Sequence, residues 1–163
     1  MMKKQMFSVR GLCISASIAA VYTLLTYLLA PISYGAVQFR VSEALTLLPV
    51  LLPEAIPGLF VGCLLANLLN PEGVNILDVI FGSLASLVAA AMTYSLRKNR
   101  WLAALPPVLV NGIVVGIILH ITYGLPLLET MGYVALGQFA VCYALGIPLI
   151  SALTKVPFLS DLK

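Results

Sequence analysis

The chain has 163 residues, of which 61% are hydrophobic and only 9% are charged. Soluble domains are about 45–50% apolar and about 25% charged, so this composition argues against a soluble enzyme and excludes a disordered chain, which would be polar. At about 20 residues per helical span, the length allows roughly six membrane crossings in a single domain over residues 1–163.

Apolar stretches separated by prolines, glycines and charged residues predict an all-α membrane protein, a bundle of six transmembrane helices. The first stretch follows a basic N-terminus and is longer than the core of a signal peptide, so we read it as a retained span. In chain order, the expected spans cover about residues 11–30, 42–52, 56–69, 76–96, 103–123 and 131–153.

Residues 41–69 are too few for two full spans and too many for one. If the N-terminus and the basic segment 97–100 are both cytoplasmic, an even number of crossings separates them. The spans at 11–30 and 76–96 supply two, so this stretch crosses twice or not at all, and we read it as crossing twice. Each helix then has about 14 residues and a length of ~21 Å, less than the ~30 Å hydrocarbon core. Pro49, Pro53 and Pro57 break the helix. We expect two short helices, shielded by the others and next to a cavity.

The positions of the basic residues predict the orientation. The chain has nine Lys and Arg, and all but Arg40 fall at the two termini or in residues 97–100. Cytoplasmic loops carry an excess of positive charge, so both termini are expected in the cytoplasm and Arg40 in the first outer loop. The basic residues are too sparse for a nucleic-acid interface.

Polar side chains that could recognise a solute gather in the expected outer half of the bundle. Polar groups inside spans are costly and often mark pathways or sites. The inner half has almost no comparable groups, whereas a channel would need them along its whole depth. We therefore predict a binding pocket that opens to the outside, with candidate residues Gln38, Arg40, Glu43, Asn67, Asp78, Asn111 and Gln138.

Structural alternatives stay open for these residues. Arg40 and Glu43 are three apart and would suit an ion pair at a helix start. Glu43 and Asp78 each open a span, where an acid favours the helix dipole. Asn67 and Asn111 would suit hydrogen bonds between helices.

Small residues form a face on the first span, where Ala16 and Ala20 are four apart. Such faces let helices approach closely in lipid. Packing within the bundle and docking of another membrane protein are both open interpretations of this face.

Motifs for catalysis are missing from the sequence. It has no phosphate-binding P-loop, nucleophile elbow or His-Glu-x-x-His pattern. Cys13, Cys63 and Cys142 lie apart in apolar runs and suit packing rather than metal binding. We therefore expect no enzyme activity, catalytic residue, metal or cofactor, and uphill transport would need an ion gradient or other subunits.

Three runs resemble the signature of the queuosine-precursor transporter (QueT) family. They are residues 35–49 (GAVQFRVSEALTLLP), 57–67 (PGLFVGCLLAN) and 78–87 (DVIFGSLASL). The resemblance implies an S component of an energy-coupling factor (ECF) transporter in the bacterial plasma membrane. It further implies six helices, a pocket capped by the first loop, and an energising module of a transmembrane T component with two cytoplasmic ABC ATPases.

The resemblance also implies roles for individual residues. Ala16 and Ala20 match the small-residue motif that contacts the T component. The implied ligand is a 7-deazaguanine in its 7-cyano or 7-aminomethyl form, with Phe39 stacked on the base. One of the two acids Glu43 and Asp78 is expected to accept hydrogen bonds from N1–H and the exocyclic amine, and the other to pair with the aminomethyl cation. The sequence leaves open which acid takes which role.

Other functions remain as alternatives. The chain would also suit an S component for another vitamin or nucleobase-like nutrient, or a stand-alone carrier of a small solute. An intramembrane enzyme using Glu43, Asp78 or His120 is a further alternative, as is a scaffold protein of the membrane.

Overall fold

The computed structural model describes residues 8–34 and 38–156. Lys3, Lys4 and Lys163, on which the expected orientation partly rests, lie outside the described residues. Within them, all regular structure is helical, which confirms the predicted all-α class. The elements are α2 (Val9–Leu28), α3 (Ala30–Ser33), η1 (Val41–Val50), α4 (Ala55–Leu68), η2 (Asp78–Gly82), α5 (Ser83–Ser95), α6 (Arg100–Ala103), α7 (Leu105–Tyr123), α8 (Leu127–Val141), η3 (Cys142–Gly146) and α9 (Ile147–Leu153).

Several of these elements join into helices of membrane length. Among the described residues, four helical stretches are long and apolar enough to cross a bilayer: Val9–Leu28, Asp78–Ser95, Arg100–Tyr123 and Leu127–Leu153. Val41–Val50 and Ala55–Leu68 are shorter apolar helices. Six crossings and the side on which the termini lie therefore remain predictions.

Two short helices occupy residues 41–69, the stretch for which the sequence left the number of crossings open. The first, η1, is a 3₁₀-helix of ten residues that contains Pro49, and at about 2.0 Å per residue it extends only ~20 Å. The second, α4, has 14 residues and extends ~21 Å. The chain turns between them at residues 51–54, where Pro53 lies.

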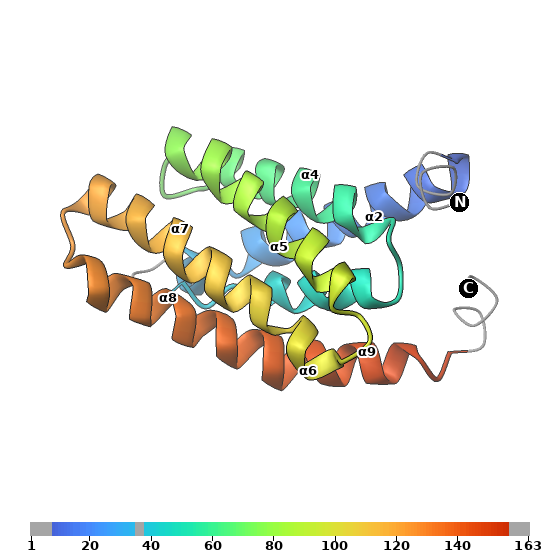
Figure 1. Ribbon diagram of the computed structural model, residues 1–163. Coiled ribbons are helices and arrows are strands. Elements are labelled where there is room, and N and C mark those ends of the chain that lie inside the picture. The colour runs from blue at the N-terminus through green and yellow to red at the C-terminus, as the bar shows by residue number, and fades with distance from the viewer. Residues whose placement is uncertain (1–7, 35–37, 157–163) are drawn as a thin grey trace.

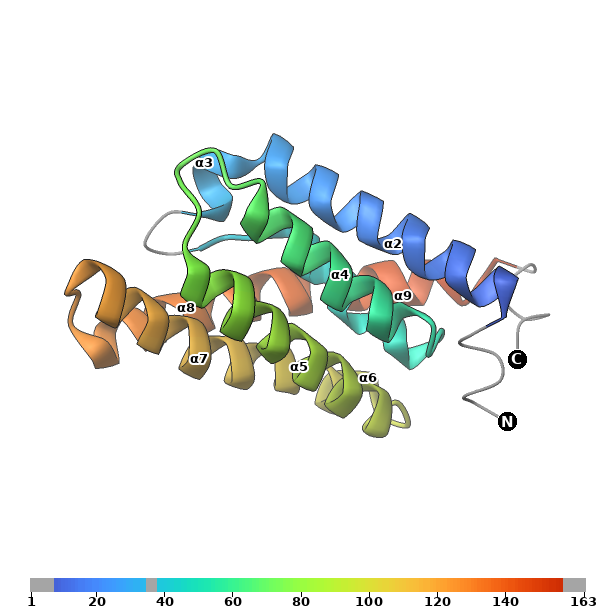
Figure 2. The ribbon, with the colours of Figure 1, turned by 90° about the horizontal axis from the view of Figure 1, so that it is seen from above.

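The helices run roughly along one common axis (Figure 1, Figure 2). Contacts link α2 to α4, α4 to α5, α5 to α7 and α7 to α8. The 3₁₀-helix η1 lies among these helices and contacts α2, α4, α5, α8, η3 and α9. Its backbone, which lacks regular α-helical bonds, is thus shielded by protein, as irregular backbone in a membrane must be.

The helices pack closely inside the bundle, and their outward faces are apolar. A Cβ at Gly116 in α7 would lie 2.8 Å from the Met131 Cα of α8, so only glycine permits this approach. Large apolar side chains remain exposed on the outward faces of the long helices, among them Leu24, Leu109, Ile113, Leu136 and Phe139. An apolar surface of this extent suits a lipid environment.

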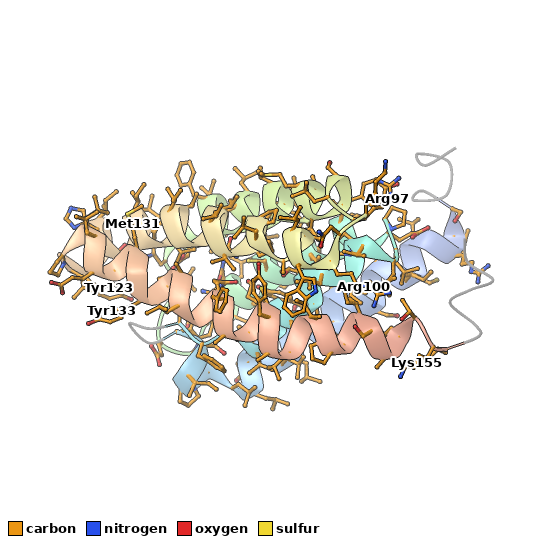
Figure 3. All side chains as sticks on the ribbon, turned by 60° about the horizontal axis from the view of Figure 1, so that its bottom comes forward. Arg97, Arg100, Tyr123, Met131, Tyr133 and Lys155 are labelled. Atoms are coloured by element: carbon orange, nitrogen blue, oxygen red, sulfur yellow. The ribbon has the colours of Figure 1, made fainter. Side chains whose placement is uncertain are left out.

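The two ends of the bundle differ in their side chains (Figure 3). Arg97, Arg100 and Lys155 lie at one end, which we call the basic end, and Tyr123, Met131 and Tyr133 lie at the opposite end. The helix α2 begins at the basic end, and α7 and α8 are joined at the opposite end (Figure 1).

Candidate functional site

Glu43 joins three helices through its carboxylate. The residue lies near the start of η1 and is 1% exposed. The Tyr22 hydroxyl of α2 donates to Oε1 at 2.5 Å, and the Asn111 amide of α7 donates to Oε2 at 3.3 Å. Each carboxylate oxygen can accept a further hydrogen bond, so the group is oriented but not saturated.

Arg40 is a buried cation next to this carboxylate. Its Nε donates to the Ser33 carbonyl at 3.2 Å, and its guanidinium lies 5.1 Å from the centre of the Tyr34 ring. Burial alone would lower the pKa of Arg40, but the ionisable groups around it, which include Asp78 and Glu43, raise the pKa above its ordinary value. Arg40 therefore stays charged, and it directs its hydrogen bond to the backbone rather than to Glu43.

Asn67 and Asp78 meet where α4 approaches η2. The Asn67 amide donates to the backbone carbonyl of Asp78 at 2.9 Å, which is the kind of interhelical bond that the sequence left as an alternative. Asp78 is 9% exposed, and at the start of this helix Asn75 Oδ1 accepts the Leu77 N–H.

Several of these residues carry a buried polar atom without a hydrogen-bond partner. Buried polar groups are normally paired, and each unpaired one costs about 1–3 kcal/mol. Among the described residues the unpaired atoms are Arg40 Nη2, Glu54 Oε2, Asn67 Oδ1, Asp78 Oδ1, Ser83 Oγ and Asn111 Oδ1. Most of them belong to the candidate site, which therefore has a cationic donor and several acceptors that are free to bond a polar ligand.

The remaining candidates lie at the border of this group. Gln138 is buried, and its Oε1 lies 3.9 Å from the Cys142 thiol, which itself lies 3.8 Å from the Glu43 carbonyl. Gln38 is buried with φ of +39°, a strained conformation for a residue other than glycine. Phe39 is half-buried. Within the described part of the chain, Gln38 and Phe39 share no side-chain hydrogen bond with the other candidates.

Departures from α-helical geometry coincide with the site. Glu43 lies on the 3₁₀-helix η1, and Asp78 opens the π-helical segment η2. Gln138 lies four residues before the second π-helical segment, η3. Long 3₁₀ runs are uncommon and π segments occur often at functional sites, which supports the assignment of function to this part of the bundle.

Sequence reasoning missed Tyr22, whose side chain is fully buried. The signal was available, because a tyrosine inside an apolar span must find a partner for its hydroxyl. Next to it, the hydroxyls of Thr26 and Ser42 are 2.6 Å apart and join α2 to η1 a second time.

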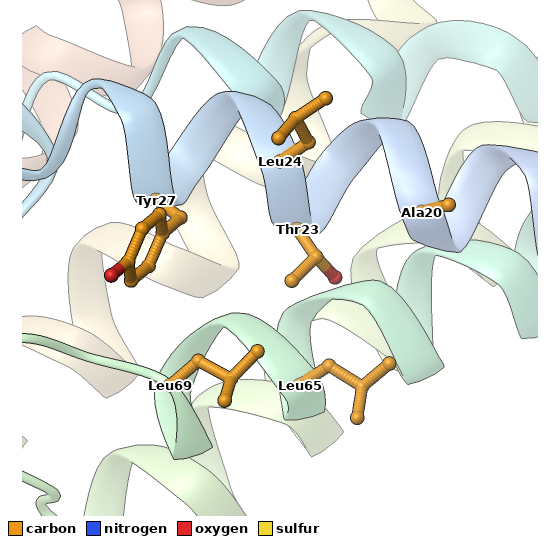
Figure 4. Close-up of a pocket in the computed structure, with 6 residues that line it drawn as sticks. All are labelled: Ala20, Thr23, Leu24, Tyr27, Leu65 and Leu69. Atoms are coloured by element: carbon orange, nitrogen blue, oxygen red, sulfur yellow. The ribbon is translucent and has the colours of Figure 1, made fainter.

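Ala16 and Ala20 lie away from the polar site, on the exposed face of α2. Ala20 borders an apolar groove of about 410 Å³ between α2 and α4 (Figure 4), which is lined by Ala20, Thr23, Leu24, Tyr27, Leu65 and Leu69. The groove has few polar groups, so it does not suit a polar solute. The exposed face is available to lipid or to another membrane protein.

Comparison with known proteins gives two matches. A family model described as QueT transporter matches residues 12–155. A segment of 75 residues is 41% identical to the protein named Queuosine precursor transporter QueT of Lactococcus lactis subsp. cremoris (strain MG1363). That match covers 45% of this chain and 43% of the relative, so it spans less than half of either protein. No solved structure matches the chain.

Proposed function

The chain belongs to the QueT transporter family, and from this premise we propose that it is a membrane subunit that captures a queuosine precursor, a 7-deazaguanine, from outside the cell. The observation that carries the proposal is the set of buried, unpaired polar atoms on Arg40, Asn67, Asp78 and Asn111. Burial of these unpaired groups is unfavourable in free energy, and hydrogen bonds to a polar ligand are expected to offset that cost.

The chemistry of the ligand matches the groups that are available. A 7-deazaguanine offers N–H donors at N1, N9 and the exocyclic amine, and acceptors at O6 and N3. Glu43 retains free acceptor positions, and Asn67 and Asn111 each have an unpaired oxygen. The unpaired Arg40 Nη2 would donate to O6, and Phe39 would stack on the base.

The proposal includes the S-component role. The loaded subunit docks on a transmembrane T component through the face that carries Ala16 and Ala20, and two cytoplasmic ABC ATPases drive its release of the ligand. The exposure of both alanines on α2 supports this assignment. The solute enters from the end opposite the basic end, beneath the segment that includes Gln38 and Phe39.

Binding of 7-deazaguanines to the purified full-length protein tests the proposal. We expect 7-cyano- or 7-aminomethyl-7-deazaguanine to raise the unfolding temperature, and Glu43→Gln to weaken binding about tenfold or more because an ionised acceptor is lost. The matched control is Glu72→Gln, which removes the same charge from an exposed acid and should bind like the wild type. The proposal fails if neither compound binds, or if Glu43→Gln binds as tightly as the control.

A further inference from the structure

Three aromatic rings form a row on the outside of the bundle, where α6 meets α8 and η3. The Tyr143 ring contacts both of the others: its centre is 4.4 Å from that of Phe139 and 5.9 Å from that of Trp101. The Tyr143 hydroxyl also donates to the Trp101 carbonyl at 2.9 Å, which links η3 to α6. Phe139 is 50% exposed and Trp101 is 63% exposed. The row is therefore an ordered aromatic surface that faces away from the bundle.

The row continues along α8 as an apolar strip. Leu136 and Phe139 are three residues apart in α8, so they share one face of the helix, and Leu136 is 65% exposed. Both belong to the stretch Leu127–Leu153, which is long and apolar enough to cross a bilayer. The strip thus runs from Trp101 toward the middle of this stretch, on a surface that suits contact with lipid chains.

Two exposed cations lie where this strip reaches the basic end. Arg100 directly precedes Trp101 in α6, and its Nη1 donates to the Ser151 hydroxyl of α9 at 3.2 Å. Lys155 follows Ser151 by four residues, and both cations lie at the basic end (Figure 3). Within residues 8–34 and 38–156, neither cation has a carboxylate partner. Their positive charge is therefore available to an anion.

We propose that this surface binds an anionic phospholipid, whose phosphate lies at Arg100 and Lys155. One of its acyl chains then lies along the rings of Trp101, Tyr143 and Phe139. Tryptophan and tyrosine are enriched at the boundary between membrane and water, and clustered Lys and Arg attract anionic lipid headgroups. A free phosphate ion could make the contacts to the cations but would leave the aromatic strip uncovered. A charged group next to an apolar chain matches both parts of the surface.

Fluorescence of Trp101 reports on this surface alone, because the chain has one tryptophan. The full-length protein is reconstituted into phosphatidylcholine vesicles that contain increasing fractions of phosphatidylglycerol with brominated acyl chains, which quench tryptophan on contact. We expect brominated phosphatidylglycerol to quench more than brominated phosphatidylcholine at the same mole fraction, with a preference of about fivefold or more. One Lys or Arg near the membrane surface strengthens binding of an anionic lipid about fivefold. Equal quenching by the two lipids would overturn the proposal.

Charge-neutralising variants locate the preference. Arg100→Gln and Lys155→Gln keep Trp101 and should each lower the preference for phosphatidylglycerol about fivefold. The matched control is Arg97→Gln, which removes the same charge from the same end, where the Arg97 guanidinium lies 4.2 Å from the centre of the Tyr94 ring. All three positions are exposed, so the fold is expected to tolerate these changes. The control should keep the preference of the wild type.

Two further results would contradict the lipid site. An equal loss of preference in Arg97→Gln would show a general attraction of anionic lipid to the basic end. Loss of the preference on addition of inorganic phosphate, at an ionic strength matched with chloride, would show a site for a free ion. The measurement uses no 7-deazaguanine, so its outcome is independent of the proposed function.

Discussion

A buried carboxyl group loses its hydration and depends on donors from the protein, and Glu43 has two such donors on different helices. The Tyr22 hydroxyl of α2 donates to one carboxylate oxygen, and the Asn111 amide of α7 donates to the other. This arrangement fixes the direction of the free acceptor positions on the carboxylate. Tyr22 therefore acts as a positioning residue for Glu43 in the proposed site.

The change Tyr22→Phe tests this role. It removes the donor to Glu43 Oε1 and leaves a buried oxygen unpaired, so we expect a loss of about 1–3 kcal/mol in stability together with weaker ligand binding. The control is Tyr143→Phe, which removes a hydroxyl that donates at 2.9 Å to the carbonyl of Trp101, the residue after Arg100 in α6. Unfolding temperature and ligand affinity are measured for both. Loss of stability without loss of affinity in Tyr22→Phe would show a purely structural role.

At this scale, sequence reasoning found the polar residues but not their bonds. Glu43 and Asp78 were identifiable because acids inside apolar spans are rare. Both oxygens of Glu43 accept hydrogen bonds from Tyr22 and Asn111 on other helices, whereas Asp78 Oδ1 has no partner. Such partners are distant in sequence, so no local pattern reveals them.

At the scale of elements, the prolines predicted the break at residues 51–54 and the shortness of η1 and α4. The 3₁₀ form of η1 and the π segments η2 and η3 had no such signal, because they depend on packing against neighbouring helices. The sequence also left open whether the small-residue face of α2 packs within the bundle or docks another protein. Gly58 of α4 approaches the Ser15 carbonyl of α2 closely, whereas Ala16 and Ala20 point away from this contact and are exposed.

The change Ala20→Leu tests the proposed docking face. A bulky side chain would prevent close approach of a partner helix, so we expect the T component to co-purify poorly while ligand binding is retained. Ala91→Leu is the matched control, because Ala91 is an exposed alanine on α5. Equal recovery of the T component with both variants would exclude this face of α2 from the docking contact.

At the scale of the whole molecule, the bundle is polarised along its axis. Arg97, Arg100 and Lys155 mark the basic end (Figure 3), while Asp78 opens η2 at the end of that helix remote from Arg97. The positive-inside rule predicts that the basic end faces the cytoplasm. Capture of a solute from outside requires the opposite end, with Glu72 in its loop, to face the exterior.

Side-specific cysteine labelling of intact cells tests this orientation, on which uptake from outside depends. In a Cys13→Ala background, the remaining Cys63 and Cys142 are buried. A cysteine introduced at an exposed position is then the one that the labelling reagent reaches. A membrane-impermeant maleimide should label Glu72→Cys on intact cells, and Lys98→Cys only after permeabilisation. Labelling of Lys98→Cys but not Glu72→Cys on intact cells would place the polar site on the cytoplasmic side and contradict capture from outside.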